Sequence, residues 1–286
     1  MNLTNVTQRS ILAAVERGDW VFQFLAPRFQ SLLIERIAKK FGISCREASS
    51  FSLMKSTALA YGELNDCERL SFAVGSRCIS FDELSDNDRS ALAHITGRIY
   101  ADRAPGAFSS DDREALAAAI ACLNERAPAS ARILEVFVQN VVKVDDVPFR
   151  SASYPRAQGC IFLGEKAFRM SPDALATSLV HELAHQELFL VNLIDRLVCA
   201  ELDYNLVHAP FQGKSRPPIG RLHSFYALFR MIQFGRQTGC ANEDHEDLLV
   251  ATVDSFQVGE LTPFGQLLVE KCAGHLFFKQ SWMRNA

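Results

Sequence analysis

In the segment "SLVHELAHQELFLVNL", residues 178–193, two histidines stand four positions apart and a glutamate directly follows the first. Residues four apart on an α-helix lie on one face, with Cβ atoms about 6 Å apart. His181 and His185 can therefore bind one metal ion. Glu182 stands one step around the helix, where a carboxylate can reach a metal-bound water.

Most faces of this helix are apolar, which predicts that it is buried. A buried pair of imidazoles without a partner is costly, and a metal ion is a suitable partner. Ser171 is placed to cap the helix, Pro172 suits its first position, and Asp173 suits the positive end of its dipole. The motif has only three fixed positions and arises by chance, so an ordinary buried helix is the alternative. A capped helix preceded by strands is the layout of zincin-type sites, and we expect a metal-binding helix.

A metal site needs a third ligand, and six downstream residues are candidates: Glu187, Glu201, His208, His223, Glu260 and His275. His223 is favoured because it lies early in the amphipathic segment "GRLHSFYALFRMIQF", just after a Pro- and Gly-rich loop that can fold back. Glu187 is six positions beyond His181, on roughly the opposite side of the helix. We expect His275 to be a core histidine.

Upstream of the motif, the first 130 residues have the pattern of helices separated by short polar breaks. We expect helices at 28–42, 82–103 and 109–127, the last with capping residues and acids in its first turn. Between 131 and 165 the residues become β-branched and aromatic. The segments "RILEVFVQNVVKV", "RSASYP" and "GCIFLGEKAF" predict two or three strands that form a small sheet.

Downstream of the motif we expect an irregular loop at 208–220 and helices at about 221–237 and 242–257. A last helix begins with Thr262 as its cap and Pro263 in its first turn. The fold class predicted is α+β, mainly α. It has a helical region over 1–130 and, over 131–286, a zincin-like core with a small sheet beside the metal-binding helix.

Composition indicates an ordinary globular protein, with 48% hydrophobic and 22% charged residues among 286. The formal net charge of −3 gives no overall attraction to nucleic acid or to a membrane surface. We expect no signal peptide, no membrane span and a cytoplasmic location. The eight cysteines are scattered singly and are expected to be reduced thiols.

Two blocks of the sequence resemble the HExxH-motif peptide-modification proteins encoded beside ribosomally made, post-translationally modified peptides. The first is "HELAHQELFLVNLIDRL", and the second is "APFQGKSRPPIGRLHSFYALFRM". The resemblance covers roughly residues 130–275. In the second block the family's spacing is preserved, and these residues fall on matching positions, with phenylalanine in place of the usual tryptophan: Pro210, Phe211, Arg216, Pro217, Gly220 and His223.

The resemblance implies an iron(II)- and 2-oxoglutarate-dependent oxygenase that hydroxylates the β-carbon of a residue in a peptide. It also implies that His181, His185 and His223 are the iron ligands. Three ligands on one side of the ion leave three positions, two for 2-oxoglutarate and one for dioxygen. A histidine then replaces the usual carboxylate of such sites.

The distal carboxylate of 2-oxoglutarate needs a cation, and arginine binds carboxylates through two parallel hydrogen bonds. Arg216 and Arg221 are the candidates, because both are close in sequence to His223. Gln212 stands where the family usually has arginine, so Lys214 or Arg216 would take over any task of that residue.

A zinc-dependent metallopeptidase or amide hydrolase is the alternative enzyme, with Glu182 as general base and His223 or Glu201 completing the site. A purely binding relative is a third interpretation. In either enzyme we expect a peptide or aminoacyl substrate, lying as an added strand along the segment "SASYPRAQGCIFLG" at 151–164. A homodimer is a further expectation about partners.

Overall fold

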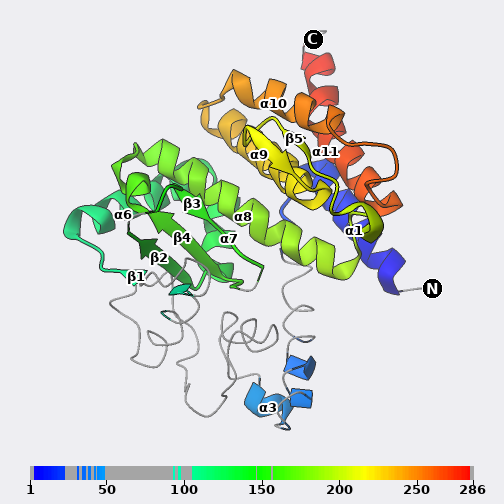
Figure 1. The fold of residues 1–286 in the computed structure, drawn as a ribbon. Helices are drawn as coiled ribbons and strands as arrows, with labels where there is room; N and C mark the ends of the chain where they lie inside the picture. Colours follow the sequence, from blue (N-terminus) through cyan, green and yellow to red (C-terminus); the bar gives the residue numbers. More distant parts are fainter. Residues whose placement is uncertain are drawn as a thin grey trace. The chain divides into compact units, whose positions relative to one another are not determined.

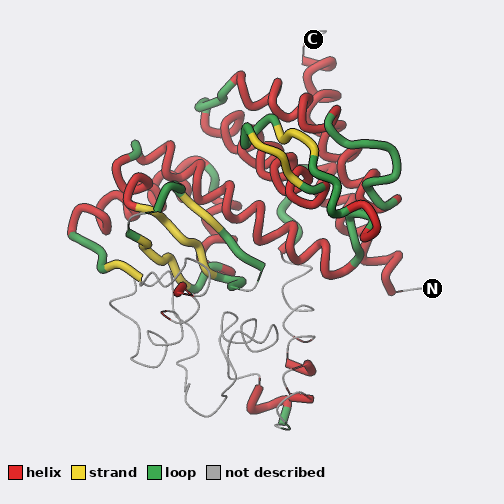
Figure 2. Tube along the Cα trace, in the orientation of Figure 1, coloured by secondary structure: helices red, strands yellow, loops and turns green. Residues whose placement is uncertain are grey.

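The computed structural model describes residues 3–22, scattered positions between 31 and 97, and then 105–145, 147–155 and 157–283. The described chain is mixed α/β and mainly helical, with a small sheet, as Figures 1 and 2 show. This confirms the expected balance of helix and strand.

The chain divides into two compact units: residues 26–182, here called the sheet unit, and residues 1–25 with 183–286, here called the C-terminal unit. This division differs from the expected boundary near residue 130. The reason is that α1 (Leu3–Arg17) packs against α11 (Pro263–Met283), with a 2.9 Å ion pair between Glu16 and Lys271. The N-terminal helix thus belongs to the same unit as the C-terminal helices.

The sheet unit contains four short strands in the order β1-β2-β4-β3. They are β1 (Pro105–Gly106), β2 (Asn140–Val144), β3 (Ser151–Ala152) and β4 (Cys160–Gly164). β2 and β4 pair in parallel, and β4 pairs antiparallel with β3 on its other side. Every residue of β4 is buried, as expected for an inner strand. β3 therefore lies at the end of the sheet.

The helices of the sheet unit include α6 (Ser110–Arg126), α7 (Pro128–Phe137) and the 3-10 helix η2 (Glu165–Arg169). α7 corrects a prediction, because "RILEVF" was expected to be a strand. Its alternating apolar residues also fit a helix: Ala131, Leu134 and Phe137 recur every third position and are buried, whereas Val136 is 74% exposed. Only the second half of that segment forms a strand, β2.

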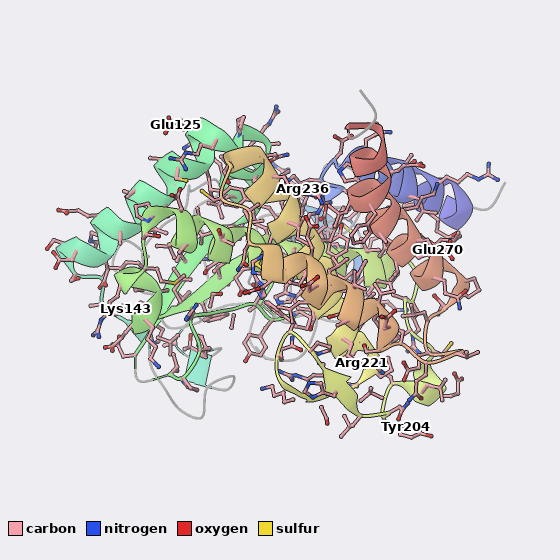
Figure 3. The ribbon with its side chains drawn as sticks, turned by 90° about the horizontal axis from the view of Figure 1, so that it is seen from above. Glu125, Lys143, Tyr204, Arg221, Arg236 and Glu270 are labelled. Atoms are coloured by element: carbon pink, nitrogen blue, oxygen red, sulfur yellow. The ribbon has the colours of Figure 1, made fainter. Side chains whose placement is uncertain are left out.

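The C-terminal unit is built mainly from α1, α9 (Pro218–Thr238), α10 (Glu243–Asp254) and α11. The expected irregular loop at 208–220 instead contains a hairpin of β5 (Val207–Ala209) and β6 (Lys214–Arg216). A 3-10 turn, η3 (Ala200–Leu202), precedes the hairpin, and a short helix, α3 (Cys45–Ala48), lies in the other unit. Among the residues labelled in Figure 3, Arg221 and Tyr204 of the C-terminal unit differ in burial. Arg221 is fully buried, whereas Tyr204 is 78% exposed.

α8 (Pro172–Ile194) carries the H-E-x-x-H motif and passes from the sheet unit into the C-terminal unit after Glu182. Its predicted cap is confirmed, because the Ser171 hydroxyl accepts a hydrogen bond of 3.3 Å from the Ala174 amide. The caps of two other predicted helices are confirmed as well. Ser109 and Asp112 form a capping box on α6, and Thr262 accepts from the Gly265 amide at the start of α11.

The helix expected at 82–103 lies almost entirely outside the described residues. The described positions of the helix expected at 28–42 are helical up to Lys39, and Gly42 has a φ of +66°. Cysteines 45, 122, 160, 199, 240 and 272, those within the described part of the chain, are free thiols. No helix among the described residues is both long enough and apolar enough to cross a membrane.

Candidate metal centre

The middle of α8 is buried on all sides except along one stripe. His181, His185 and Phe189 are half-buried, whereas the residues between them are buried. These three side chains recur every fourth position, so they share one face of the helix. The two imidazoles therefore lie on the single face of this segment that solvent or a ligand reaches.

His181, Glu182 and His185 each offer a ligand atom, and these atoms all lie within 4.8 Å of one another. The Nε2 atom of His181 is 3.8 Å from the Oε1 atom of Glu182. The cluster follows from the continuous helix of α8, which fixes these neighbours on adjacent steps of the same turn. The sequence prediction that these residues come together on one helix is confirmed.

Glu182 is 1% exposed, which is unusual for a carboxylate. Its Oε1 atom accepts a 2.7 Å hydrogen bond from the Ser151 hydroxyl, and its main-chain oxygen accepts one of 3.4 Å from Ser153. Its Oε2 atom is buried and has no hydrogen-bond partner among the described residues. Burial raises the pKa of this carboxyl to about 7, although the two serine hydroxyls favour the charged form.

His223 lies in the second turn of α9, and its Nδ1 atom is 3.2 Å from the Nδ1 atom of His185. Two nitrogens that bind one ion at about 2.0–2.1 Å are separated by about 2.8–3.4 Å at octahedral or tetrahedral angles. The Phe189 ring lies 4.6 Å from the His223 ring and stacks on the His185 ring at 6.5 Å. The spacing of these two nitrogens therefore fits one metal ion between His185 and His223, while the cluster of possible ligands on α8 consists of His181, Glu182 and His185.

The other candidates for a third ligand are engaged elsewhere. Glu187 is fully buried and accepts hydrogen bonds from the Val21 amide, the Tyr226 hydroxyl and the Arg230 guanidinium. His275 contacts the Glu16 carbonyl at 2.9 Å through Nδ1 and packs against Phe229.

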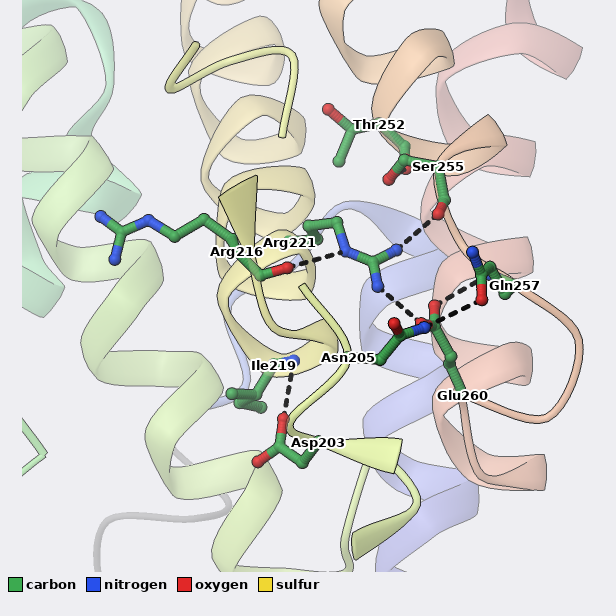
Figure 4. A network of polar contacts seen from close by, with 9 residues as sticks. All are labelled: Asp203, Asn205, Arg216, Ile219, Arg221, Thr252, Ser255, Gln257 and Glu260. Carbon is green, nitrogen blue, oxygen red and sulfur yellow. Dashed lines mark hydrogen bonds and ion pairs between the residues drawn. The ribbon is translucent and has the colours of Figure 1, made fainter. Parts of the chain in front are cut away.

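Two more of those candidates, Glu201 and His208, are exposed on η3 and β5. Glu260, the last, belongs to the polar network of Figure 4 and is 1% exposed. Of the six downstream candidates, His223 is thus the one that contacts a histidine of α8.

Arg221 does not support its predicted role as an anchor for 2-oxoglutarate, as Figure 4 shows. Its side chain is 0% exposed and donates to the Glu260 carboxylate at 2.7 Å, to the Ser255 carbonyl, and to the Arg216 carbonyl at 3.4 Å. Each of its three nitrogens therefore has a partner inside the C-terminal unit. The residue joins α9 to the segments before α11, and its function is structural.

Arg216, the second predicted anchor, lies at the end of β6, and its side chain extends away from the Arg221 network in Figure 4. Its Nε atom is buried and has no hydrogen-bond partner among the described residues. The stem of this arginine lies against Gly220, where an added Cβ would be 3.3 Å from the Arg216 Cβ. Because Gly220 is three positions before His223 on α9, Arg216 lies beside the helix face that carries His223.

Sequence reasoning missed three residues of the site: Ser151, Ser153 and Phe189. The signal for the serines was present in "RSASYP", because alternate residues of an extended segment face the same side. The signal for Phe189 was its place four residues after His185. Neither pattern says which side of the segment faces α8, because that depends on tertiary packing.

No protein-family model matches this chain, and no curated protein matches it either. The functional assignment therefore depends on the residues of the site and on the sequence resemblance described above.

Proposed function

We propose that this protein is a mononuclear iron(II)- and 2-oxoglutarate-dependent oxygenase that hydroxylates a β-carbon in a peptide substrate. His181, His185 and His223 would hold the metal. The 3.2 Å separation between the Nδ1 atoms of His185 and His223 supports this ligand set. When bound, iron(II) and 2-oxoglutarate would supply the chemistry by which dioxygen, the oxidant, hydroxylates the substrate while 2-oxoglutarate is oxidised to succinate and CO2.

The observation that carries the choice of an oxygenase is the position of Arg216. The buried Nε atom of Arg216 has no hydrogen-bond partner in the part of the chain that the structure describes, which is costly for a cation unless an anion completes it. Arg216 lies against Gly220, one helical turn from His223, and its planar guanidinium suits a carboxylate. The distal carboxylate of 2-oxoglutarate would be bound there while its other end faces the histidines.

The remaining residues of the site would orient groups and exclude water. Phe189 covers one side of the His185 and His223 rings, which limits their rotation and keeps solvent from that side. The buried Glu182 carboxylate lies next to His181 and would hold that ring or accept a proton from a ligand in the site. Under this proposal, the small sheet and the motif of α8 would together form a zincin-like core.

The substrate would be an extended peptide added to the outer edge of β3, which pairs with no other strand among the described residues. This strand is at the end of the sheet order, and its residues Ser151 and Ala152 are half-buried. Edge strands present unpaired main-chain groups that can pair with a second chain. This placement agrees with the expected segment at 151–164, except that β4, its second half, is an inner strand.

The experiment that tests the proposal is an anaerobic loading of the purified protein with iron(II), followed by addition of 2-oxoglutarate and air. Succinate should form, and its rate should rise when a substrate peptide is added. Arg216→Ala should reduce succinate formation without removing the metal. Tightly bound zinc together with peptide cleavage, and no succinate, would contradict the proposal.

A zinc hydrolase remains the second candidate because of one observation. The Glu182 carboxylate lies within the His181–Glu182–His185 cluster and keeps one oxygen without a hydrogen-bond partner in the described chain. A general base needs such an oxygen. Glu182→Gln should abolish hydrolysis, whereas an oxygenase should retain a measurable part of its turnover.

A further inference from the structure

The Glu182 carboxylate is held by a residue far from the motif. The Ser151 hydroxyl donates a 2.7 Å hydrogen bond to its Oε1 atom, and the two residues are 31 positions apart in the chain. Both belong to the sheet unit, so the contact lies within one compact body. The Ser153 hydroxyl also favours the charged form of this carboxyl and donates to the Glu182 main-chain oxygen at 3.4 Å, so the 2.7 Å contact of Ser151 is the shorter of the two serine contacts.

Ser151 lies on β3, and the register of β3 against β4 fixes the position of its hydroxyl. Ser151 pairs with Leu163 of β4, and the neighbouring Arg150 carbonyl accepts from the Gly164 amide at 2.9 Å. Ser153, two positions later, touches the main-chain oxygen of the same glutamate. Alternate residues of the extended segment 151–153 thus contact one residue of α8. The segment 151–153 therefore holds Glu182 through two serine hydroxyls.

We propose that Ser151 is a positioning residue that fixes the Glu182 carboxylate beside the metal-binding histidines. Ser151 holds the Oε1 atom, which is 3.8 Å from the Nε2 atom of His181, so the carboxylate cannot rotate freely beside that ring. Groups that act at a metal centre are oriented by such outer hydrogen bonds, whose loss lowers activity more than it changes the fold. This inference rests on the proposed metal centre at His181, His185 and His223.

A purely structural role would predict a different outcome. Ser151 is half-buried on an edge strand, and its neighbour Ala152 already shows that this strand accepts a small apolar side chain. Removing the hydroxyl creates little cavity, so the fold and the metal ligands should persist. What changes is the carboxylate, which loses the 2.7 Å hydrogen bond from Ser151 while it stays buried.

The test uses four variants of the full chain: Ser151→Ala, Ser151→Thr, Glu182→Gln, and the double change Ser151→Ala with Glu182→Gln. Ser110→Ala, which removes an exposed hydroxyl on α6, is the matched control. Zn²⁺ affinity is measured by chelator competition, and crystal structures of the Zn²⁺-loaded wild type and Ser151→Ala chains are compared. Succinate release from 2-oxoglutarate with iron(II) gives the turnover.

Zn²⁺ affinity should stay within about threefold in every single serine variant, and Glu182 should adopt a different side-chain conformation in Ser151→Ala. Turnover should fall about tenfold or more in Ser151→Ala, the scale of a lost hydrogen bond to a charged group. Ser151→Thr, which keeps the hydroxyl, should restore it, and Ser151→Ala should have no further effect in the Glu182→Gln background.

An unchanged Glu182 conformation in Ser151→Ala would overturn the positioning role. So would a Ser151→Ala change that lowers turnover in the Glu182→Gln variant by the same factor as in the wild type. If the wild type releases no succinate, the oxygenase proposal fails. The crystal structures and the Zn²⁺ affinities would still decide whether Ser151 positions Glu182.

Discussion

The Nδ1 atoms of His185 and His223 lie 3.2 Å apart, although the residues are 38 positions apart in the sequence and belong to different helices. Two charged imidazoles would repel each other at this distance. The pair is stable when one neutral ring donates to the other, or when both rings bind one cation. Beside them, His181 and Glu182 occupy the preceding turn of α8, which favours the cation.

The first prediction concerns the third ligand. His223→Ala should lower the affinity for Fe²⁺ or Zn²⁺ as severely as His181→Ala, because each variant removes one of three ligands. The measurement is metal content after dialysis, together with chelator competition. His208→Gln, on the exposed face of β5, is the control and should bind metal like the wild type. Full metal content in His223→Ala would place the third ligand elsewhere.

The Arg216 side chain should make a large contribution to the affinity for 2-oxoglutarate. Arg216→Ala should weaken binding of the keto acid by about 10- to 100-fold, since hydrogen bonds to a charged group are worth about 1.5–3 kcal/mol. Arg216→Lys should recover only part of the affinity, because an ammonium cannot donate two parallel bonds. Calorimetry with the metal-loaded protein under anaerobic conditions measures both values.

Lys214 provides the comparison for that prediction. It lies on the same strand, β6, two residues from Arg216, and is exposed. Lys214→Ala should leave the affinity for 2-oxoglutarate unchanged. If Lys214→Ala weakens binding and Arg216→Ala does not, the anchor is the lysine rather than the arginine.

The buried pair Arg221–Glu260 should be a large contributor to folding. Glu260→Gln leaves a fully buried guanidinium without its carboxylate, and we expect a loss of about 3–5 kcal/mol in the free energy of unfolding. The double replacement Arg221→Met with Glu260→Leu should regain much of this loss, because it removes both charges. Urea unfolding measures both values. A loss below about 1 kcal/mol in Glu260→Gln would show that the pair is solvated.

The same pair predicts a pH dependence. Although burial opposes it, the hydrogen bonds from Arg221, the Gln257 amide and Asn205 lower the pKa of Glu260 below its ordinary 4.5. A lowered pKa means stability that is present above 4.5 and is lost as the pH falls through the lower folded-state pKa. The Tm difference between wild type and Glu260→Gln should therefore shrink below that value. A difference that grows on acidification would contradict this sign.

Arg230 should link the N-terminal segment to α8. Its guanidinium donates to Glu187 of α8 and to the carbonyls of Gly18 and Asp19, and it lies 4.3 Å from the Trp20 ring. Arg230→Lys should cost several kcal/mol of unfolding free energy, roughly 3–5, because an ammonium cannot serve these partners together. Urea unfolding measures the change, and a loss under about 1 kcal/mol would show that the segment is held by other contacts.

Local signals predicted much of the fold. The caps at Ser109, Ser171 and Thr262 place three helices correctly, because capping depends on a few adjacent residues. The segment 132–137 was assigned to a strand, since Leu134, Val136 and Val138 alternate. Short apolar runs fit both periods, and only packing decides between them.

The site was predicted less completely. The His181–His185 pair follows from helical spacing alone, and His223 follows from its place after a loop that can fold back. Arg221 was misjudged because closeness in sequence to His223 says nothing about a partner 39 positions later, Glu260. Likewise the Ser151–Glu182 hydrogen bond is a tertiary contact that has no pattern in the chain.

The most direct test of the central claim is an anaerobic crystal structure with iron(II) and 2-oxoglutarate. The account predicts one ion bound by His181, His185 and His223, with the keto acid chelating it and its distal carboxylate on Arg216. An ion bound without His223, or a metal-loaded site that leaves the keto acid unbound at saturating concentration, would contradict it.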